Sequence, residues 1–215
     1  MMDELEFLKK DWQKKEAQLP KLSYEDIYKM ILKKSSSIVK WIFYISVIEF
    51  ILPHLLYLLP SARGSMEIYQ KLGLQGFLVA LSIFQYTVVF FFIYQFYKRY
   101  KEISVLDNAK NLMHKIIKTR RTVKHYIIFS LSLILISFAL FVVGIYLSDD
   151  LNASLGISFE IIEQIPPQKL KMMLMLIMSV SGVIITALVG GIYFLLYGLL
   201  LRKLNDNYNE LKRLE

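Results

Sequence analysis

The chain has 215 residues, of which 55% are hydrophobic, and its formal net charge is +8. It contains no cysteine, so disulfides, thiolate metal sites and cysteine nucleophiles are excluded. A positive net charge can indicate nucleic-acid binding, but in a membrane protein basic residues on the cytoplasmic loops are its commoner cause. We therefore do not predict a nucleic-acid partner.

Four apolar stretches indicate the class of protein. They cover residues 39–59, 72–97, 126–147 and 172–201, and each has the length of about 18 or more residues that is typical of a transmembrane helix. The first 20 residues are highly charged and lack the apolar core of a signal peptide, so we expect the first stretch to act as the insertion signal. The sequence predicts an all-α, polytopic membrane protein whose four transmembrane helices form two hairpins of a four-helix bundle.

The stretches divide the chain into five segments. We expect a cytoplasmic amphipathic arm over residues 1–38, a first transmembrane hairpin over 39–97, a basic cytoplasmic helix or loop over 98–125, a second transmembrane hairpin over 126–201 and a cytoplasmic tail over 202–215. The region through Lys40, the central segment and the tail hold 22 of the Lys and Arg residues, and the two remaining connections hold four. Because basic residues concentrate on the cytoplasmic side, this split predicts that both termini lie in the cytoplasm.

The N-terminal arm has the pattern of an amphipathic helix. Leu5, Leu8 and Trp12 recur near the spacing of one helical face. This helix either lies on the membrane surface or on the protein's own cytoplasmic side, or it docks a partner through residues such as Trp12. A second helix is predicted to begin at Ser23, an N-cap residue with Asp26 in a capping-box position, and to continue into the first span.

Glu49 is the one acidic residue within a predicted span. A carboxyl group in the hydrocarbon layer is costly, so Glu49 is a candidate functional residue. It either binds a proton or a cation, or it stays protonated and bonds to a Ser or Gln of a neighbouring span. His54 is a second candidate within the membrane, but five helical positions separate it from Glu49 by about 140°, so the two residues do not share a face.

The segment 98–125 supplies the candidate residues for binding a partner or lipid. Asp107 and Asn108 are typical of a turn or an N-cap, and residues 109–124 are predicted to form a helix that leads directly into the third span. Its apolar side is expected to contain Leu112, Ile116 and either Val123 or Met113. Its basic candidates are Lys115, Lys118, Arg120, Arg121 and Lys124. These residues attract either anionic lipid or an acidic soluble protein.

Small residues are concentrated in the fourth span, which Pro166 and Pro167 are expected to precede. The candidates for close helix packing are Gly182, Ala187, Gly190, Gly191 and Gly198. Residues of this size allow helices to approach closely in lipid. They predict either packing inside the bundle or contact with a second copy of the chain in a homo-oligomer.

A weak internal repeat relates the entries to the first and third spans. Ile31-Leu32-Lys33 matches Ile116-Ile117-Lys118 at a shift of 85 positions, and Trp41 then corresponds to Tyr126. The match indicates two helical hairpins in parallel orientation, each with a basic lead-in helix.

Three phrases of the sequence resemble a known family. They are LKKDWQKK near the start, YEDIYKMILKKSSSIVKWIF before the first span and DNAKNLMHKIIKTRRTVKHY before the third. They are similar to an uncharacterised family of small four-span inner-membrane proteins of Gram-negative bacteria. The resemblance covers most of the chain and implies a bacterial inner (plasma) membrane location. Members often lie next to genes for extracytoplasmic-function sigma factors, which implies a membrane-anchored regulator, and some carry the label beta-carotene monooxygenase.

No catalytic arrangement is recognisable in the sequence, and we predict no catalytic, metal-binding or cofactor-binding residue. The three histidines are His54, His114 and His125, which are too few and too dispersed for the metal site of a membrane oxygenase. Our leading hypothesis is a non-enzymatic regulatory or scaffold protein that presents a basic cytoplasmic face to a soluble partner or to anionic lipid. The alternative is a small oligomeric transporter or channel that uses Glu49, and the third hypothesis is a membrane enzyme.

Overall fold

The computed structural model of the protein describes residues 6–10, 23–56, 70, 72–104, 108–148 and 166–214. Residues 1–5 and 11–22 of the N-terminal arm lie outside these residues, including Trp12, whose docking role therefore stays a prediction. Residues 57–69, which end the first predicted span and begin the connection to the second, also lie outside them. So do residues 149–165, between the third and fourth predicted spans.

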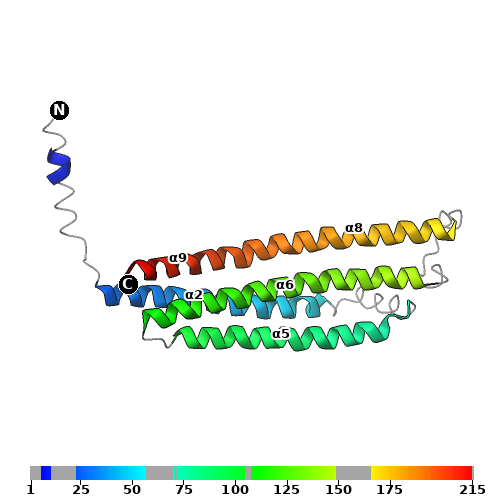
Figure 1. The fold of residues 1–215 in the computed structure, drawn as a ribbon, viewed down its shortest axis with the longest axis horizontal. Helices are drawn as coiled ribbons and strands as arrows, with labels where there is room; N and C mark the ends of the chain where they lie inside the picture. Colours follow the sequence, from blue (N-terminus) through cyan, green and yellow to red (C-terminus); the bar gives the residue numbers. More distant parts are fainter. Residues whose placement is uncertain are drawn as a thin grey trace.

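Long helices make up nearly all of the described chain (Figure 1). They are α2 (Tyr24–Leu56), α5 (Gln75–Ser104), α6 (Ala109–Leu147), and a continuous rod formed by α8 (Pro167–Tyr193), the π-helix η1 (Phe194–Gly198) and α9 (Leu199–Leu214). The described residues contain no strand. The all-helical prediction is confirmed, and four helices are long and apolar enough to cross a membrane.

Local signals in the sequence determine where the helices begin. The Ser23 hydroxyl accepts a bond from the backbone N–H of Asp26, and the Asp26 carboxylate accepts one from the Ser23 backbone, which confirms the predicted capping box. Asn108 is the N-cap of α6, and its side chain accepts a 2.8 Å bond from the backbone N–H of Lys110. The rod begins at Pro167, which needs no backbone donor in the first helical turn.

Asn108 gives a direct test of the predicted α6 boundary. Replacing Asn108 with Ala is expected to lower the free energy of unfolding by about 1 kcal/mol, because an N–H in the first turn of α6 loses its acceptor. Thermal unfolding in detergent, followed by circular dichroism, measures this change. Asn111→Ala is the matched control, since Asn111 is exposed one turn further along the same helix. Equal losses in the two variants would contradict the capping role.

The helices form two antiparallel pairs, α2 with α5 and α6 with α8 (Figure 1). The helices α2 and α6 begin at the same end of the molecule, where α5 and α9 finish. We call this the basic end, and the opposite one the far end. At the basic end α9 contacts both α2 and α6, while α5 contacts α6. These contacts close a bundle of four helices at that end.

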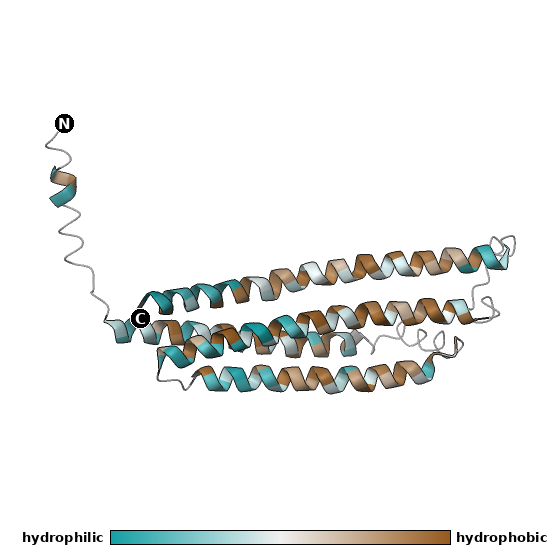
Figure 2. Cartoon of the chain, viewed as in Figure 1, coloured by the Kyte–Doolittle hydropathy of each residue, from teal (hydrophilic) through white to brown (hydrophobic). Residues whose placement is uncertain are grey.

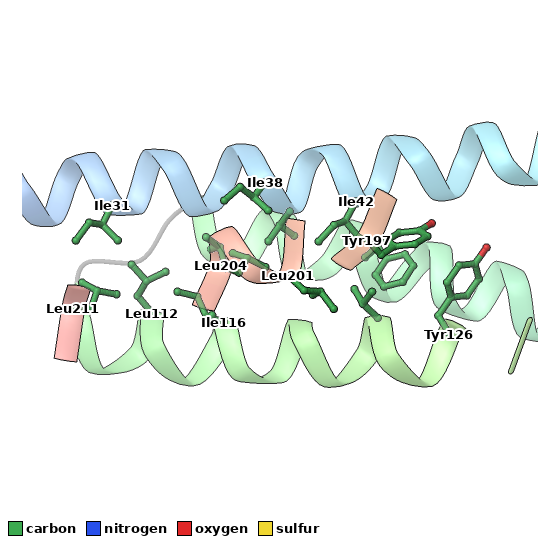
Figure 3. Packing of buried hydrophobic residues seen from close by; sticks show 14 of the residues in the cluster. Ile31, Ile38, Ile42, Leu112, Ile116, Tyr126, Tyr197, Leu201, Leu204 and Leu211 are labelled. Carbon is green, nitrogen blue, oxygen red and sulfur yellow. The ribbon is translucent and has the colours of Figure 1, made fainter. Parts of the chain in front are cut away.

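The buried core lies towards the basic end, where α2, α6 and α9 meet and α5 adds Phe96 and Ile103 (Figure 3). On α9, the positions Leu201, Leu204, Asn207 and Leu211 are buried at a spacing of three or four residues, as expected for one helical face. On α6, the buried positions include Leu112, Ile116, Thr119 and Val123. Val123, rather than the half-buried Met113, therefore completes the apolar side that the sequence predicted.

Apolar side chains point outward over the rest of the molecule. Hydrophobic residues predominate along the middle of the helices and towards the far end, where only the tips of α5 and α8 are hydrophilic, and most hydrophilic residues gather at the basic end (Figure 2). In α8 the buried residues are Leu170, Gly182 and Tyr193, whereas large apolar side chains such as Leu176 and Leu188 are each 64% exposed. Such a surface is what lipid, rather than water, solvates favourably.

The small residues of the rod do not all pack in the same way. A Cβ atom at Gly182 would lie 2.8 Å from the Cβ and Cγ atoms of Phe138 on α6, so this glycine allows α8 to approach α6 closely. A Cβ at Gly190 would be 3.7 Å from Leu131. Gly191 has open space around it and Ala187 is exposed. A Cβ at Gly198 would meet Phe194 of the same rod.

The two lead-in helices agree with the internal repeat at some positions. Ile31 and its counterpart Ile116 are both buried, and α2 and α6 run in the same direction from the basic end (Figure 1). Trp41 is 57% exposed, however, while its counterpart Tyr126 is 2% exposed. The repeat stays a prediction, and any symmetry between the hairpins does not extend to these aromatic side chains.

Candidate functional site

Glu49 of α2 is held by two tyrosines of the long rod. The hydroxyl of Tyr193, the last residue of α8, donates to Glu49 Oε1. The hydroxyl of Tyr197, within η1, donates to Glu49 Oε2 over 3.0 Å. Each oxygen of the carboxyl group therefore accepts at least one phenolic hydrogen bond. We call these three residues the Glu49 cluster.

Helix geometry explains why both tyrosines reach the same carboxyl group. Residues four positions apart lie on the same side of a helix, and the rings of Tyr193 and Tyr197 are accordingly in edge contact at 5.7 Å. Tyr126 of α6 packs against both rings, with its centroid 6.4 and 6.0 Å away. Phe96 of α5 contacts Tyr126 in turn, at 5.5 Å. The Glu49 cluster thus stands at a level to which all four long helices contribute.

The rod departs from α-helical geometry next to this cluster. The five residues of η1 form a π-helix, and the backbone N–H of Phe194 is shared between the carbonyl oxygens of Gly190 and Gly191. Single π-helical turns within α-helices are uncommon and frequently occur at functional sites. Here the irregular turn carries one of the two tyrosines that bind Glu49.

The side chains that bond to Glu49 differ from those that the sequence predicted. Among protein partners we expected a Ser or Gln of a neighbouring span, whereas the structure places two tyrosine hydroxyls there. The binding of a proton or a cation by Glu49 stays a prediction. The pattern Tyr193-x-x-x-Tyr197 within the last apolar stretch was the available signal, because it puts two hydroxyl groups on one helical face. Nothing in that pattern identifies Glu49 as the residue they meet.

His54 belongs to a different contact. Its Nδ1 lies 2.7 Å from the carbonyl oxygen of Phe50, and its Nε2 lies 3.0 Å from the hydroxyl of Tyr86 on α5. His54 therefore links α2 to α5 inside one hairpin, whereas Glu49 links α2 to the other hairpin. His114 and His125 are exposed on α6. Within the described residues, no three His, Asp or Glu side chains are grouped as metal ligands.

The exposed side of α6 near the basic end carries a row of cations. Lys110, Lys118, Arg121 and Lys124 are exposed and fall within about 120° of one another around the helix, opposite its buried face. We call these four residues the α6 basic stripe. The sequence from 109 to 125 contains no Asp or Glu. The stripe is therefore uninterrupted by acidic residues of its own helix.

Two other predicted basic candidates are used inside the molecule. Lys115 Nζ lies 2.8 Å from the carboxylate of Glu102 on α5, which also binds the buried Arg99 at 3.1 Å. Arg120 donates to the side-chain oxygen of Asn205 on α9 over 2.6 Å. These contacts hold the start of α6 against its neighbours, so Lys115 and Arg120 contribute less to the outer surface than the stripe does.

A buried polar contact between α2 and α9 was not anticipated from the sequence. The amide of Asn207 donates to the hydroxyl of Ser35 over 2.9 Å, and both residues are almost fully buried. Buried polar groups are costly unless each has a hydrogen-bond partner. The bond between Asn207 and Ser35 forms only in one relative position of α9 and α2, so it favours that position over others. The mutual position of the two residues could be inferred only once the helices were packed.

Comparison with known proteins gives a family but no chemistry. Residues 25–215 match the family described as Domain of unknown function (DUF8845). The chain belongs to this family. The matched range of DUF8845 begins in the first turn of α2 and includes all four long helices, the Glu49 cluster and the α6 basic stripe. No curated protein and no solved structure matches the chain.

Proposed function

We propose that this protein is a non-enzymatic, multi-pass membrane protein with a regulatory or scaffold role, and that its basic end lies in the cytoplasm of a bacterium. The proposed location is the bacterial inner membrane. The proposed orientation rests on the 22 Lys and Arg residues in the N-terminal region, the central segment and the tail, against four on the other side. The proposed binding face is the α6 basic stripe, and the proposed partner is an acidic surface of a soluble protein.

The direction of the stripe is the observation that carries this proposal. The stripe runs from Lys124 to Lys110 along the continuous helix α6, away from its apolar part. The four long helices are nearly parallel (Figure 2). At about 1.5 Å per residue, Lys118 and Lys110 lie about 12 and 24 Å beyond Tyr126, where the apolar stretch begins. Only the part of the stripe closest to Tyr126 is therefore near a membrane surface.

This spacing distinguishes a protein partner from lipid. The headgroup layer extends only about 5–8 Å beyond the hydrocarbon on each side of a bilayer. Lys124 and Arg121 fall within that depth of Tyr126 and are suited to anionic lipid. Lys118 and Lys110 fall outside it, in water, where an acidic protein surface is the partner able to neutralise them. The positions of the charges on this helix thus favour a soluble protein along the outer half of the stripe.

The test compares two triple variants of the full chain. One reverses the stripe with Lys110→Glu, Lys118→Glu and Arg121→Glu. The other reverses three exposed cations of α9 with Lys203→Glu, Lys212→Glu and Arg213→Glu. Partners are cross-linked in intact membranes, identified after purification in mild detergent, and then titrated against each variant in nanodiscs of neutral lipid.

We expect an acidic soluble protein to bind the wild-type chain and the α9 variant. The stripe variant should bind it at least about tenfold more weakly, because three reversed contacts each cost up to about 1 kcal/mol. If the two variants lose equal affinity for the partner, only the total charge of the chain matters. That result would contradict the α6 basic stripe as the binding face. The absence of any partner that depends on the stripe would contradict the proposal as a whole.

The sequence resemblance suggests one class of partner. If members of the resembled family act with the extracytoplasmic-function sigma factors encoded beside them, a sigma factor or a protein that controls it is the first partner to test. The transporter or channel hypothesis has less support from the packing, because Val39 and Ile42, which lie between Glu49 and the basic end, are fully buried. The described residues support no particular reaction for the enzyme hypothesis.

A further inference from the structure

We propose that the Glu49 cluster is a proton-operated latch that closes the seam between α2 and the long rod, with η1 as the hinge. The proposal concerns the apolar part of the molecule and does not depend on which partner binds the α6 basic stripe. It rests on three features of the structure: the change of neighbours along the rod, the irregular turn at η1 and the bonds to Glu49.

The rod changes its neighbours at the Glu49 cluster. On the basic side, α9 packs against both α2 and α6. On the far side, α8 has its extensive contact with α6. Side chains of α2 beyond Glu49 are exposed, including Leu52 and Leu55, and so is most of the α8 surface, including Leu188. The bonds from Tyr193 and Tyr197 to Glu49 therefore join α2 to the rod where the closed bundle ends.

The irregular turn at η1 lets α8 move while α9 stays in place. The Leu201, Leu204 and Leu211 side chains anchor α9 in the core. The backbone bond of Phe194 is divided between two acceptors, and shared bonds are weaker than a single well-aligned bond. A Cβ atom at Gly191 would meet nothing within 4 Å. The side of this turn that Gly191 faces therefore has no packing partner among the described residues, although Tyr193 in the same turn is buried.

Glu49 is the group of the latch that a proton can switch. An ionised carboxylate accepts both tyrosine hydroxyls, and bonds to a charged acceptor are about twice as strong as neutral ones. A proton on the carboxyl group removes this charge and turns one of its two oxygens into a donor. The two tyrosine hydroxyls then no longer each donate to a negatively charged oxygen, so their bonds to Glu49 are weaker. Protonation is therefore expected to loosen the latch, and ionisation to tighten it.

The surroundings of the latch contain no second charge among the described contacts. The rod presents Tyr193 and Tyr197, α6 presents Tyr126, and α5 presents phenylalanines to Tyr126. Phenols ordinarily titrate near pH 10, several units above a carboxyl group. On α2 itself, His54 is bonded to Tyr86 and not to the latch. A response between pH 5 and 8 that disappears with Glu49 would therefore come from its carboxyl group.

The absence of cysteine from the chain allows the latch to be tested with spin labels in the full protein. One labelled pair, Leu55→Cys and Leu188→Cys, spans the seam on the far side of Glu49. A second pair, Lys34→Cys and Asp206→Cys, spans α2 and α9 at the basic end and reports whether the closed bundle persists. Pulsed electron spin resonance measures both distances in lipid nanodiscs at pH 5 and pH 8.

In the wild-type background we expect the seam distance to be longer and broader at pH 5 than at pH 8. Glu49→Gln should give the longer distance at both pH values. Tyr193→Phe with Tyr197→Phe should do the same, because only the two hydroxyl groups are lost and the rings remain. Tyr86→Phe is the matched control, since its hydroxyl bonds within one hairpin, and it should retain the pH response. The basic-end distance should not change in any of these variants.

Three results would overturn the latch. They are a wild-type seam distance that is independent of pH, a pH response that persists in Glu49→Gln, and a closed seam in the double Tyr→Phe variant. If the double variant also lengthens the basic-end distance, its helices no longer form the closed bundle, and its seam distance does not test the latch. The comparison of the wild type with Glu49→Gln then tests it. A pH response that disappears equally in Tyr86→Phe would assign the switch to His54 and would also overturn the proposal.

Discussion

Leu204→Ala is expected to lower the free energy of unfolding by about 2–5 kcal/mol, the largest effect of any single substitution considered for this protein. Leu204 is fully buried in the core between α2, α6 and α9 (Figure 3). Truncation to Ala removes its apolar contacts and leaves a cavity that the surrounding helices fill only in part. The variant therefore tests whether the stability of the molecule depends on the packing of its basic end.

Leu199→Ala is the matched control for this prediction. Leu199 lies five residues earlier on the same helix and is 58% exposed. Its truncation should change the free energy of unfolding by less than about 0.5 kcal/mol. Unfolding is measured by circular dichroism in the same detergent for both variants. A loss at position 199 as large as that at position 204 would contradict the packing of α9 described above.

Gly182→Ala is expected to destabilise the protein by about 1–3 kcal/mol, because it overpacks the contact between α8 and α6. The new methyl group would lie 2.8 Å from the Cβ atom of Phe138. That atom is attached to the α6 backbone, so it cannot move away unless the two helices separate. The same detergent unfolding experiment measures the loss.

Gly191→Ala should act in the opposite direction. Position 191 lies on the same helix with open space around it, so the methyl group is accommodated. Ala is favoured over Gly in a helix interior, and the variant should gain up to about 1 kcal/mol. If the two glycines respond alike, the contact of Gly182 with Phe138 does not limit the approach of α8 to α6. A clear loss at position 191 would instead favour contact with a second copy of the chain.

Much of the architecture could be predicted because its determinants are local. The four long helices follow from four apolar stretches, and the starts of α2 and α6 follow from Ser23 and Asn108. An N-cap acts within three residues of itself, so no knowledge of the rest of the fold is needed to recognise it. The apolar side of the α6 lead-in follows in the same way from the spacing of Leu112 and Ile116.

The candidate site could be predicted only in part, because its contacts join distant parts of the chain. Glu49 was identifiable as an acidic residue in an apolar stretch, but its partners come 144 and 148 residues later. The basic candidates of α6 were identifiable as a group. Their division into the outward-facing Lys118 and the internally bonded Lys115 depends on which side Glu102 of α5 occupies.

The sequence by itself determined that this protein consists of long apolar helices with a strongly basic end, because length, hydropathy and charge are summed along the chain. The tertiary structure alone decided which of those residues act together. It placed two tyrosine hydroxyls on Glu49 and Asn207 on Ser35, and it left the α6 basic stripe uncovered. The physical reason is that a hydrogen bond requires two groups within about 3 Å, and only the packing of the helices brings groups so far apart in sequence to that distance.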